Sequence, residues 1–157
     1  MNCIMKKHII LLFVCCTALF VSCFKDNDKD FYFKDFRVEF QDAVLNNNAV
    51  DKDFPVIDSK VGLNSYQVNL LGGLKNESFD VAVKVLKEES TAVEGVDYKF
   101  KDGEKIIFQD EKAISHLEIE VLNSSRTEDL LLVVELQPSE SIKVNKNFKT
   151  IGVKIKK

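Results

Sequence analysis

Cysteine is the residue type whose placement says most about the chemistry open to this chain. The four cysteines, Cys3, Cys15, Cys16 and Cys23, all lie within the first 23 of the 157 residues. No disulfide, zinc–thiolate site or thiol nucleophile can therefore form in the part of the chain that follows them. If a targeting segment is removed directly before Cys23, this residue is the one thiol that remains. Chemistry on that thiol itself is then the first hypothesis.

The first 22 residues have the pattern of a secretory signal peptide. Two lysines precede an apolar run of about 13 residues that ends at Val21, whereas a membrane-spanning helix needs roughly 20. A small residue, Ser22, stands directly before Cys23. The segment Phe-Val-Ser-Cys resembles a lipobox, with Phe20 where Leu is usual. This resemblance implies cleavage before Cys23, a diacylglyceryl thioether on its sulfur and acylation of its new amine. The alternative is an ordinary signal peptide with an incidental cysteine.

The charged run that follows the cysteine predicts a short disordered tether. Lys25, Asp26 and Asp28, interrupted by Asn27, also form an acidic pattern that resembles the surface-export signal of Bacteroidota lipoproteins. That resemblance implies a protein anchored by lipid in the outer membrane and exposed at the cell surface; the alternative is a solvated spacer. The expected divisions of the chain are a signal peptide at residues 1–22, a lipidated tether at residues 23–35 and a folded domain at residues 36–157.

Catalytic side chains are scarce in the rest of the chain. His116 is the only histidine after the predicted signal peptide, and the alternation around it places it with Glu118 and Glu120 on the solvent side of a strand. The sequence contains no Gly-x-Ser-x-Gly elbow, phosphate-binding glycine loop or His-x-x-x-His pair. We therefore predict that the protein is not an enzyme.

The charge balance argues against a nucleic-acid partner. All 25 acidic residues and all but two of the 22 basic residues follow the predicted signal peptide, so the mature chain carries an acidic excess of five charges. Phosphate binding needs a clustered basic face. Lys154, Lys156 and Lys157 do form a small basic end, which alternation with Ile155 predicts to be a solvated strand edge.

The elements that must position these residues are β-strands. From Phe36 onward, apolar side chains recur at every second position, which is typical of strands with one buried face. The clearest runs cover residues 36–40, 66–70, 79–85, 117–121 and 151–155. Turn-forming segments separate these runs, and no long helical stripe interrupts them. We expect an all-β fold, an immunoglobulin-like antiparallel β-sandwich of about seven to nine strands.

Four segments carry more specific expectations. Residues 130–134, which read Leu-Leu-Leu-Val-Val, predict a strand covered on both faces, with an interaction surface as the alternative. Asp102-Gly103 predicts a hairpin turn between residues 98–100 and 106–108. Residues 43–62 follow neither period, which indicates a long loop with one short strand near Val56. The aromatic cluster at residues 31–36 is either a first strand entering the core or a patch for the membrane or a partner.

Residues 90–98 read Ser-Thr-Ala-Val-Glu-Gly-Val-Asp-Tyr, a stretch that resembles the Calx-beta signature. The likeness extends roughly over residues 66–136. The chain is also similar to an uncharacterised family of Bacteroidota lipoproteins that share the Thr-Ala-Val-Glu-Gly stretch. Both resemblances imply an immunoglobulin-like sandwich that works in adhesion or recognition, which is a wide class of functions.

The resemblance also raises the question of calcium. Calx-beta domains that bind calcium gather carboxylates from several loops at one end, because Ca²⁺ takes about six to eight oxygen ligands. The resemblance implies Asp97, Glu128 and Glu94 as the ligands of a possible weak calcium site. The loop where the family supplies consecutive aspartates reads Asn-Ser-Ser-Arg at residues 123–126, which argues against such a site. We expect no metal cofactor, and we expect Asp97 to bond backbone groups of its own turn. The covalent lipid on Cys23 is then the only attached group.

Together these observations predict a nonenzymatic surface lipoprotein whose sandwich is an interaction or accessory module. It would be bound to the membrane through its lipid, with an envelope protein or a glycan as its partner. One alternative is a glycan-binding component of a nutrient uptake system, although the chain has no Trp to stack on sugar rings. The other alternative is a calcium-stabilised adhesion domain.

Replacing Cys23 tests the anchor. A Cys23→Ala variant should lose palmitate labelling and leave the membrane fraction, because each buried methylene of an acyl chain stabilises attachment by about 0.8 kcal/mol. Metabolic labelling and membrane fractionation measure the two effects. Cys16→Ala is the matched control and should change neither. Wild-type labelling and membrane retention of Cys23→Ala would contradict the predicted anchor.

Overall fold

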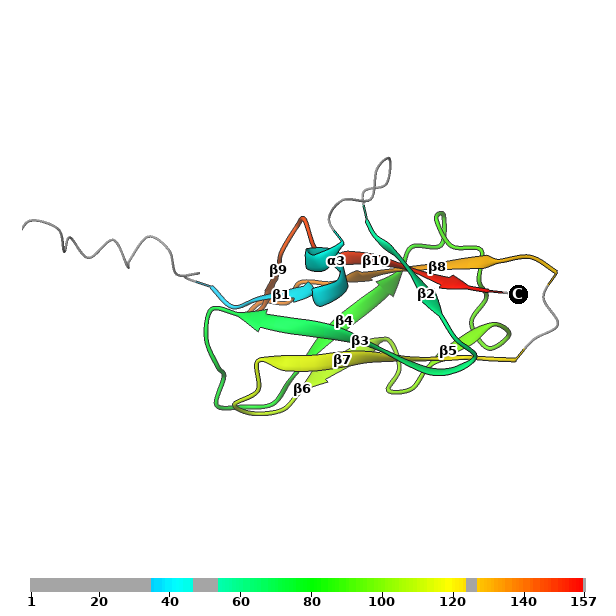
Figure 1. Ribbon diagram of the computed structural model, residues 1–157. Coiled ribbons are helices and arrows are strands. Elements are labelled where there is room, and N and C mark those ends of the chain that lie inside the picture. The colour runs from blue at the N-terminus through cyan, green and yellow to red at the C-terminus, as the bar shows by residue number, and fades with distance from the viewer. Residues whose placement is uncertain (1–34, 47–53, 124–126, 157) are drawn as a thin grey trace, which may run out of the picture. The chain divides into compact units, whose positions relative to one another are not determined.

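The computed structural model describes residues 35–46, 54–123 and 127–156. The predicted signal peptide, Cys23 and residues 24–34 lie outside the described residues, as do residues 47–53, 124–126 and 157. The described chain forms two β-sheets packed face to face (Figure 1). The all-β, immunoglobulin-like sandwich expected from the sequence is therefore confirmed.

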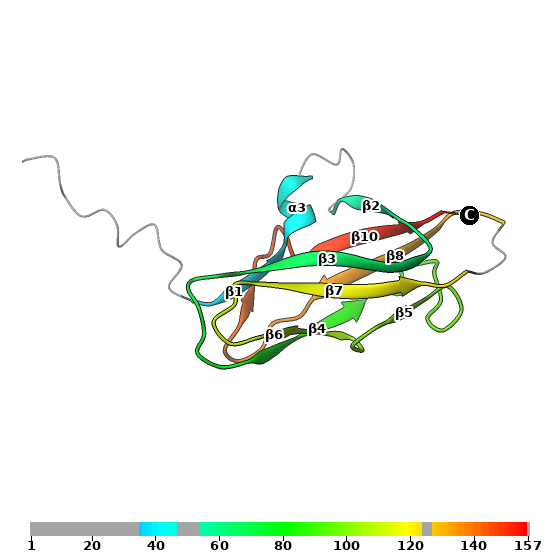
Figure 2. The ribbon, with the colours of Figure 1, turned by 60° about the horizontal axis from the view of Figure 1, so that its bottom comes forward.

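Each sheet contains five strands. Sheet A has the order β5 (Tyr98–Phe100), β7 (Ile114–Val121), β3 (Gly62–Leu71), β1 (Arg37–Phe40), β9 (Lys143–Val144). Sheet B has the order β2 (Val56–Ser59), β10 (Thr150–Ile155), β8 (Leu130–Leu136), β4 (Phe79–Val85), β6 (Lys105–Phe108). Figure 2 shows β3 beside β7 in one layer and β10 beside β8 in the other.

Most neighbouring strands are antiparallel, but two pairs are not. β9 runs parallel to β1, and β2 runs parallel to β10. These two short strands also raise the strand number above the expected seven to nine, roughly the range for sandwiches of this class. Residues 143–144 are too few to show a period-two pattern, which explains why the sequence did not reveal β9.

One hydrophobic core fills the space between the sheets. Alternate residues of β3, β7 and β10 point into it and are at most 5% exposed: Tyr66, Val68, Leu70, Leu117, Ile119, Val121, Ile151, Val153 and Ile155. At the β4–β6 edge, the rings of Phe79 and Phe108 stack with their centroids 4.9 Å apart. Full burial of one such side chain stabilises the fold by about 1.5–3 kcal/mol, so the period-two pattern largely drives the assembly.

The predicted hairpin across Asp102-Gly103 is wrong. β5 belongs to sheet A and β6 to sheet B, so the connection between them crosses from one sheet to the other. Lys101 N donates to Glu118 O at 3.0 Å, which commits β5 to β7, and Val83 N donates to Glu104 O at 2.9 Å, which commits β6 to β4. Both strands bury alternate side chains in the same core. Each strand achieves this at the edge of its own sheet, with the two sheets facing each other across the core.

The expectation that residues 130–134 form a strand covered on both faces is confirmed. Val133, on the outer face of β8, is as fully buried as Leu132 and Val134. Gly152 lies opposite Val133 on β10, and a Cβ added there would lie 3.1 Å from the Phe54 ring. The absence of a side chain at Gly152 thus makes room for Phe54 on the outer face of sheet B.

The sequence predicted that the basic end is a solvated strand edge. It does not lie at an edge, because β10 lies between β2 and β8. Lys154 pairs with Asp129 at 2.9 Å and Lys156 with Asp58 at 2.7 Å. The side chains of both lysines stay at least 40% exposed, so they are solvated and neutralised rather than gathered into a basic face. Lys157 lies outside the described residues.

The weakly patterned segment after β1 contains a strand and a short helix. The strand expected near Val56 is β2, whereas the helix α3 (Gln41–Leu45) was not predicted. Ala43 is the buried residue of α3, which contacts β1, β3 and β10. One buried residue in five leaves no helical period to detect in the sequence. No helix among the described residues is long and apolar enough to cross a membrane.

Phe36 is the one described member of the aromatic cluster, and it packs against the core. The Lys75 ammonium lies 5.4 Å from the Phe36 ring centroid and 5.3 Å from that of Phe79. This contact favours the interpretation that Phe36 enters the core over a role in a membrane or partner patch. Residues 31–34 lie outside the described residues.

The phenol of Tyr66 provides a test of the core. Its hydroxyl is buried and has no hydrogen-bond partner in the described part of the chain. Burial raises the pKa of Tyr66, and the nearby Asp42 carboxylate raises it further. Tyr66→Phe removes an unpaired polar group, so the free energy of unfolding should stay unchanged or rise by up to about 1 kcal/mol.

Denaturant unfolding measures this change. As a control, Tyr66→Ala should lower the free energy of unfolding by about 3–5 kcal/mol, because it leaves a cavity in the core. A loss of more than about 1 kcal/mol in Tyr66→Phe would mean that the hydroxyl is bonded in solution.

Candidate functional site

The Ser-Thr-Ala-Val-Glu-Gly stretch completes the hydrogen bonding of β8. β4 pairs with β8 only from Leu136 to Val134, so the chain after β4 must satisfy the rest of that edge. Ser90 Oγ accepts a hydrogen bond from Val133 N at 2.9 Å, and Thr91 Oγ1 accepts one from Leu131 N at 2.9 Å. In return, Thr91 N donates to Leu131 O at 2.7 Å. The first half of the Calx-beta-like motif therefore serves the fold.

Asp97 closes the second half of the motif into a turn. It is only 6% exposed, and its Oδ2 accepts a hydrogen bond from Val93 N at 2.9 Å. Asp97 N donates back to Val93 O at 2.8 Å, and Gly95 N donates to Tyr98 O at 2.8 Å. Gly95 has φ +79°, a backbone conformation that favours glycine. Asp97 thus forms the backbone bond that the sequence predicted for it.

The other two residues singled out for calcium are both exposed. Glu94 is exposed on the turn, and Glu128 is exposed just before β8. No group of three or more His, Cys, Asp or Glu side chains in the described ranges is arranged to hold a metal ion. The Asp97 carboxylate accepts a hydrogen bond from the backbone of its own turn, which is a structural role.

His116 lies on the outer face of sheet A, as the alternation predicted. It is exposed and stands opposite Gln67 of β3, whose amide donates to Asn69 at 2.8 Å. The Asn69 amide in turn donates to Gln41. The outer face of sheet A is therefore polar around His116, with amides that bond to one another.

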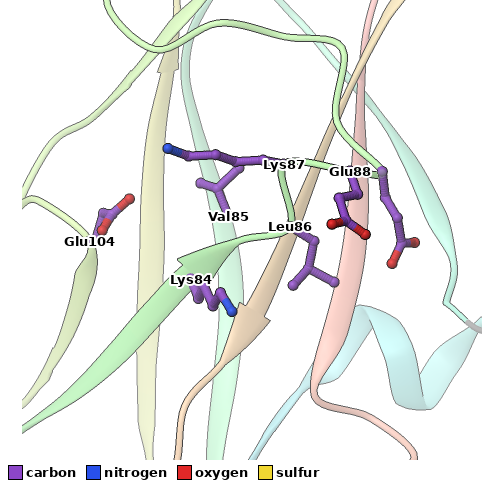
Figure 3. A pocket seen from close by; sticks show the side chains of 7 residues that line it. Lys84, Val85, Leu86, Lys87, Glu88 and Glu104 are labelled. Atoms are coloured by element: carbon purple, nitrogen blue, oxygen red, sulfur yellow. The ribbon is translucent and has the colours of Figure 1, made fainter.

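A surface hollow of about 510 Å³ lies where β4 ends. Figure 3 shows ammonium and carboxylate groups interspersed around it, and Lys84, Lys87, Glu88 and Glu104 are among the residues that line it. Charges of both signs in one open hollow favour neither an anionic nor a cationic ligand. This hollow is therefore not the candidate site.

The strands give the sandwich two ends. At the near end, β1 begins at Arg37 opposite Leu71, the last residue of β3. At the far end, β3 begins at Gly62 opposite Val121, which also lies opposite Tyr98, the first residue of β5. Ten residues of β3 separate the ends by about 30 Å. In Figure 1 the near end is at the left, and the C-terminus marks the far end at the right.

Four exposed apolar side chains gather at the far end and form the candidate site. Val61 is 59% exposed, Leu63 55%, Val93 55% and Val96 58%. These four residues, called the far-end patch below, are Val61 just before β3, Leu63 at the start of β3, and Val93 and Val96 in the turn before β5. They are four of the six large apolar side chains that are at least 55% exposed in the described chain. Exposed apolar side chains that lie together on a small domain often mark a binding site.

The far-end patch was missed in the sequence, although one signal was present. Leu63 has the opposite phase to Tyr66, Val68 and Leu70, so it must point outward from β3. Val93 and Val96 gave no such signal, because a turn has no period that separates inside from outside.

Comparisons with known proteins found similar solved structures but no family. No family model and no curated protein matches the chain. Among solved structures, CBD12 from CALX1.2 is 22% identical with a TM-score of 0.49, over 76% of this chain and 43% of that one. The calcium binding domain CBD12 of CALX1.1 is 24% identical with a TM-score of 0.48, over 64% and 40%. The chain thus spans less than half the length of either. Because both TM-scores are below 0.5, the fold assignment rests on the sheets themselves.

The hydroxyl of Thr91 can be tested by an isosteric change. Thr91→Val leaves Leu131 N without its side-chain acceptor and should lower the free energy of unfolding by about 0.5–1.5 kcal/mol, because the bond is exposed and water can replace part of it. Thermal or denaturant unfolding measures the loss. Thr91→Ser keeps the hydroxyl and should lose less. Equal stability of Thr91→Val and wild type would show that this motif residue is not needed by the fold.

Proposed function

We propose that the chain is an outer-membrane lipoprotein displayed at the cell surface, similar to Bacteroidota surface lipoproteins. Its sandwich is a nonenzymatic interaction module for an envelope assembly. The observation that carries this proposal is the far-end patch, where four apolar side chains stay more than half exposed. Contact of apolar side chains with water costs free energy, so exposed apolar surface of this kind is typical of a site that another molecule covers on binding.

The direction of the chain supports the same function. The predicted tether from Cys23 joins the domain at the near end, where β1 begins. The far-end patch lies about 30 Å from this point along β3, at the other end of the sandwich. A lipid-anchored domain built this way can reach a partner with its far end while its near end stays beside the membrane.

The placement of the polar motif residues also supports binding rather than catalysis. Ser90, Thr91 and Asp97 use their side chains to bond the backbone of β8 and of the turn at Val93. His116 is exposed on the outer face of sheet A, where it meets solvent that a reaction site would exclude.

Cysteine variants test both display and binding, because the chain has no cysteine after Cys23. Leu74→Cys, in the connection between β3 and β4, and Val96→Cys, at the far end, replace residues that are 55% and 58% exposed. Both thiols should react with a membrane-impermeant maleimide on intact cells. Val96→Cys should react about threefold more slowly on cells than in the purified protein, while Leu74→Cys should not, because a bound partner shields the far end.

Mass shift on a gel, measured over a time course, follows both reactions. Labelling of neither thiol until the outer membrane is opened would rule out surface display. Equal rates on cells and in purified protein for both thiols would rule out an interaction at the far end.

A further inference from the structure

We infer that the partner of the far-end patch is a protein whose contact surface is apolar and bordered by Lys or Arg side chains. This inference rests on the proposed function and adds the chemistry of the partner. Two features of the far end carry it: a continuous apolar strip and an excess of carboxylates that lack an ion pair.

The two halves of the strip meet at Leu122, the residue that follows β7. Val61 directly precedes Gly62, which lies opposite Val121, the residue before Leu122. On the other side of Leu122, its backbone N donates to Asp97 O at 2.8 Å. Asp97 closes the turn that carries Val93 and Val96. Leu122 is half-buried and thus bridges the exposed residues from β3 and from the turn.

The turn that carries Val93 and Val96 is also rigid enough to bind without large reordering. Three hydrogen bonds hold it, from Val93 N to Asp97 Oδ2, from Asp97 N to Val93 O and from Gly95 N to Tyr98 O. A surface fixed before binding keeps more of its contact energy as affinity, because less chain entropy is lost.

The charges around the strip are mostly acidic. Many far-end charges are already paired, such as Lys99 with Glu120 at 3.0 Å. Among the described residues of this end and of the hollow where β4 ends, the carboxylates without an ion pair are Glu88, Glu89, Glu94, Glu104 and Glu128, against the ammonium groups of Lys60, Lys84 and Lys87. Glu94 lies within the strip itself, between Val93 and Val96. Basic side chains on the partner would therefore be attracted to the rim of the contact.

The same charges disfavour a second copy of this chain. A symmetric contact between two far ends would bring each Glu94 toward the acidic rim of the other copy. Like charges placed together across an interface oppose association. A partner with the opposite charge around an apolar centre fits both features of the far end.

Photo-crosslinking identifies the partner. Benzoylphenylalanine at position 96 in the full-length lipoprotein on cells should crosslink one envelope protein, and the same probe at position 74 should not. A product with a second copy of the chain, a glycan or a lipid would overturn the inference, as would equal products from both positions or none from either. The failure of surface display is separately visible, because Leu74→Cys would then not label on intact cells.

Binding measurements with the purified partner test its chemistry. Val96→Asp and Val61→Asp should each weaken binding by about tenfold, since a charge is forced into an apolar contact. Glu94→Lys should weaken it by about threefold, and added salt should weaken the wild type more than Glu94→Lys. Leu74→Asp is the matched control with unchanged affinity, and thermal unfolding checks that each variant is folded. Unchanged or tighter binding of Glu94→Lys would overturn the basic rim, and unchanged binding of both Asp variants would overturn the apolar centre.

Discussion

The backbone of β8 sets the constraint on which the rest of this sandwich depends. Its residues 132–134 are fully buried on both faces, so every backbone group beside them must find a partner within the protein. β10 satisfies one edge along the whole strand, but β4 satisfies only the last three residues of the other. The hydroxyls of Ser90 and Thr91 supply acceptors where the β-ladder stops. The conspicuous polar residues of the motif are thereby explained by a hydrogen-bonding requirement of a central strand.

The same requirement shapes the far end. Once the chain has followed β8 as far as Leu131, it must return to sheet A to begin β5 beside β7. The turn held by Asp97 makes this return, and its geometry leaves Val93 and Val96 pointing into solvent. The exposed apolar surface thus sits on a segment that the fold holds firmly, which is the arrangement that a binding surface needs. Asp97 contributes by positioning the turn.

Polar surface elsewhere on the sandwich is largely occupied by contacts within the protein. On the outer face of sheet A, Lys101 pairs with Glu118, and the amides of Gln67 and Asn69 donate along the sheet. Exposed ion pairs of this kind contribute about 0–1 kcal/mol each, so they keep the sheet soluble more than they stabilise it. The contrast with the far end, where four apolar side chains of the described chain stay more than half exposed, is what distinguishes that end as a site.

The sequence by itself determined the fold class and the inward face of each long strand. Side chains alternate with period two in β3, β4, β7 and β10, and burial of one phase is enough to specify two packed sheets. The sequence also determined the confinement of cysteine to the first 23 residues, on which the predicted anchor depends. Only the tertiary structure decided which strands pair. The Asp102-Gly103 turn is compatible with a hairpin, but β5 and β6 gain more by pairing with β7 and β4 across the core. The tertiary structure also decided the far-end patch. Residues 61–63 and residues 93–96 come to the same end through the long-range pairing of β3 and β5 with β7, which no local sequence pattern encodes.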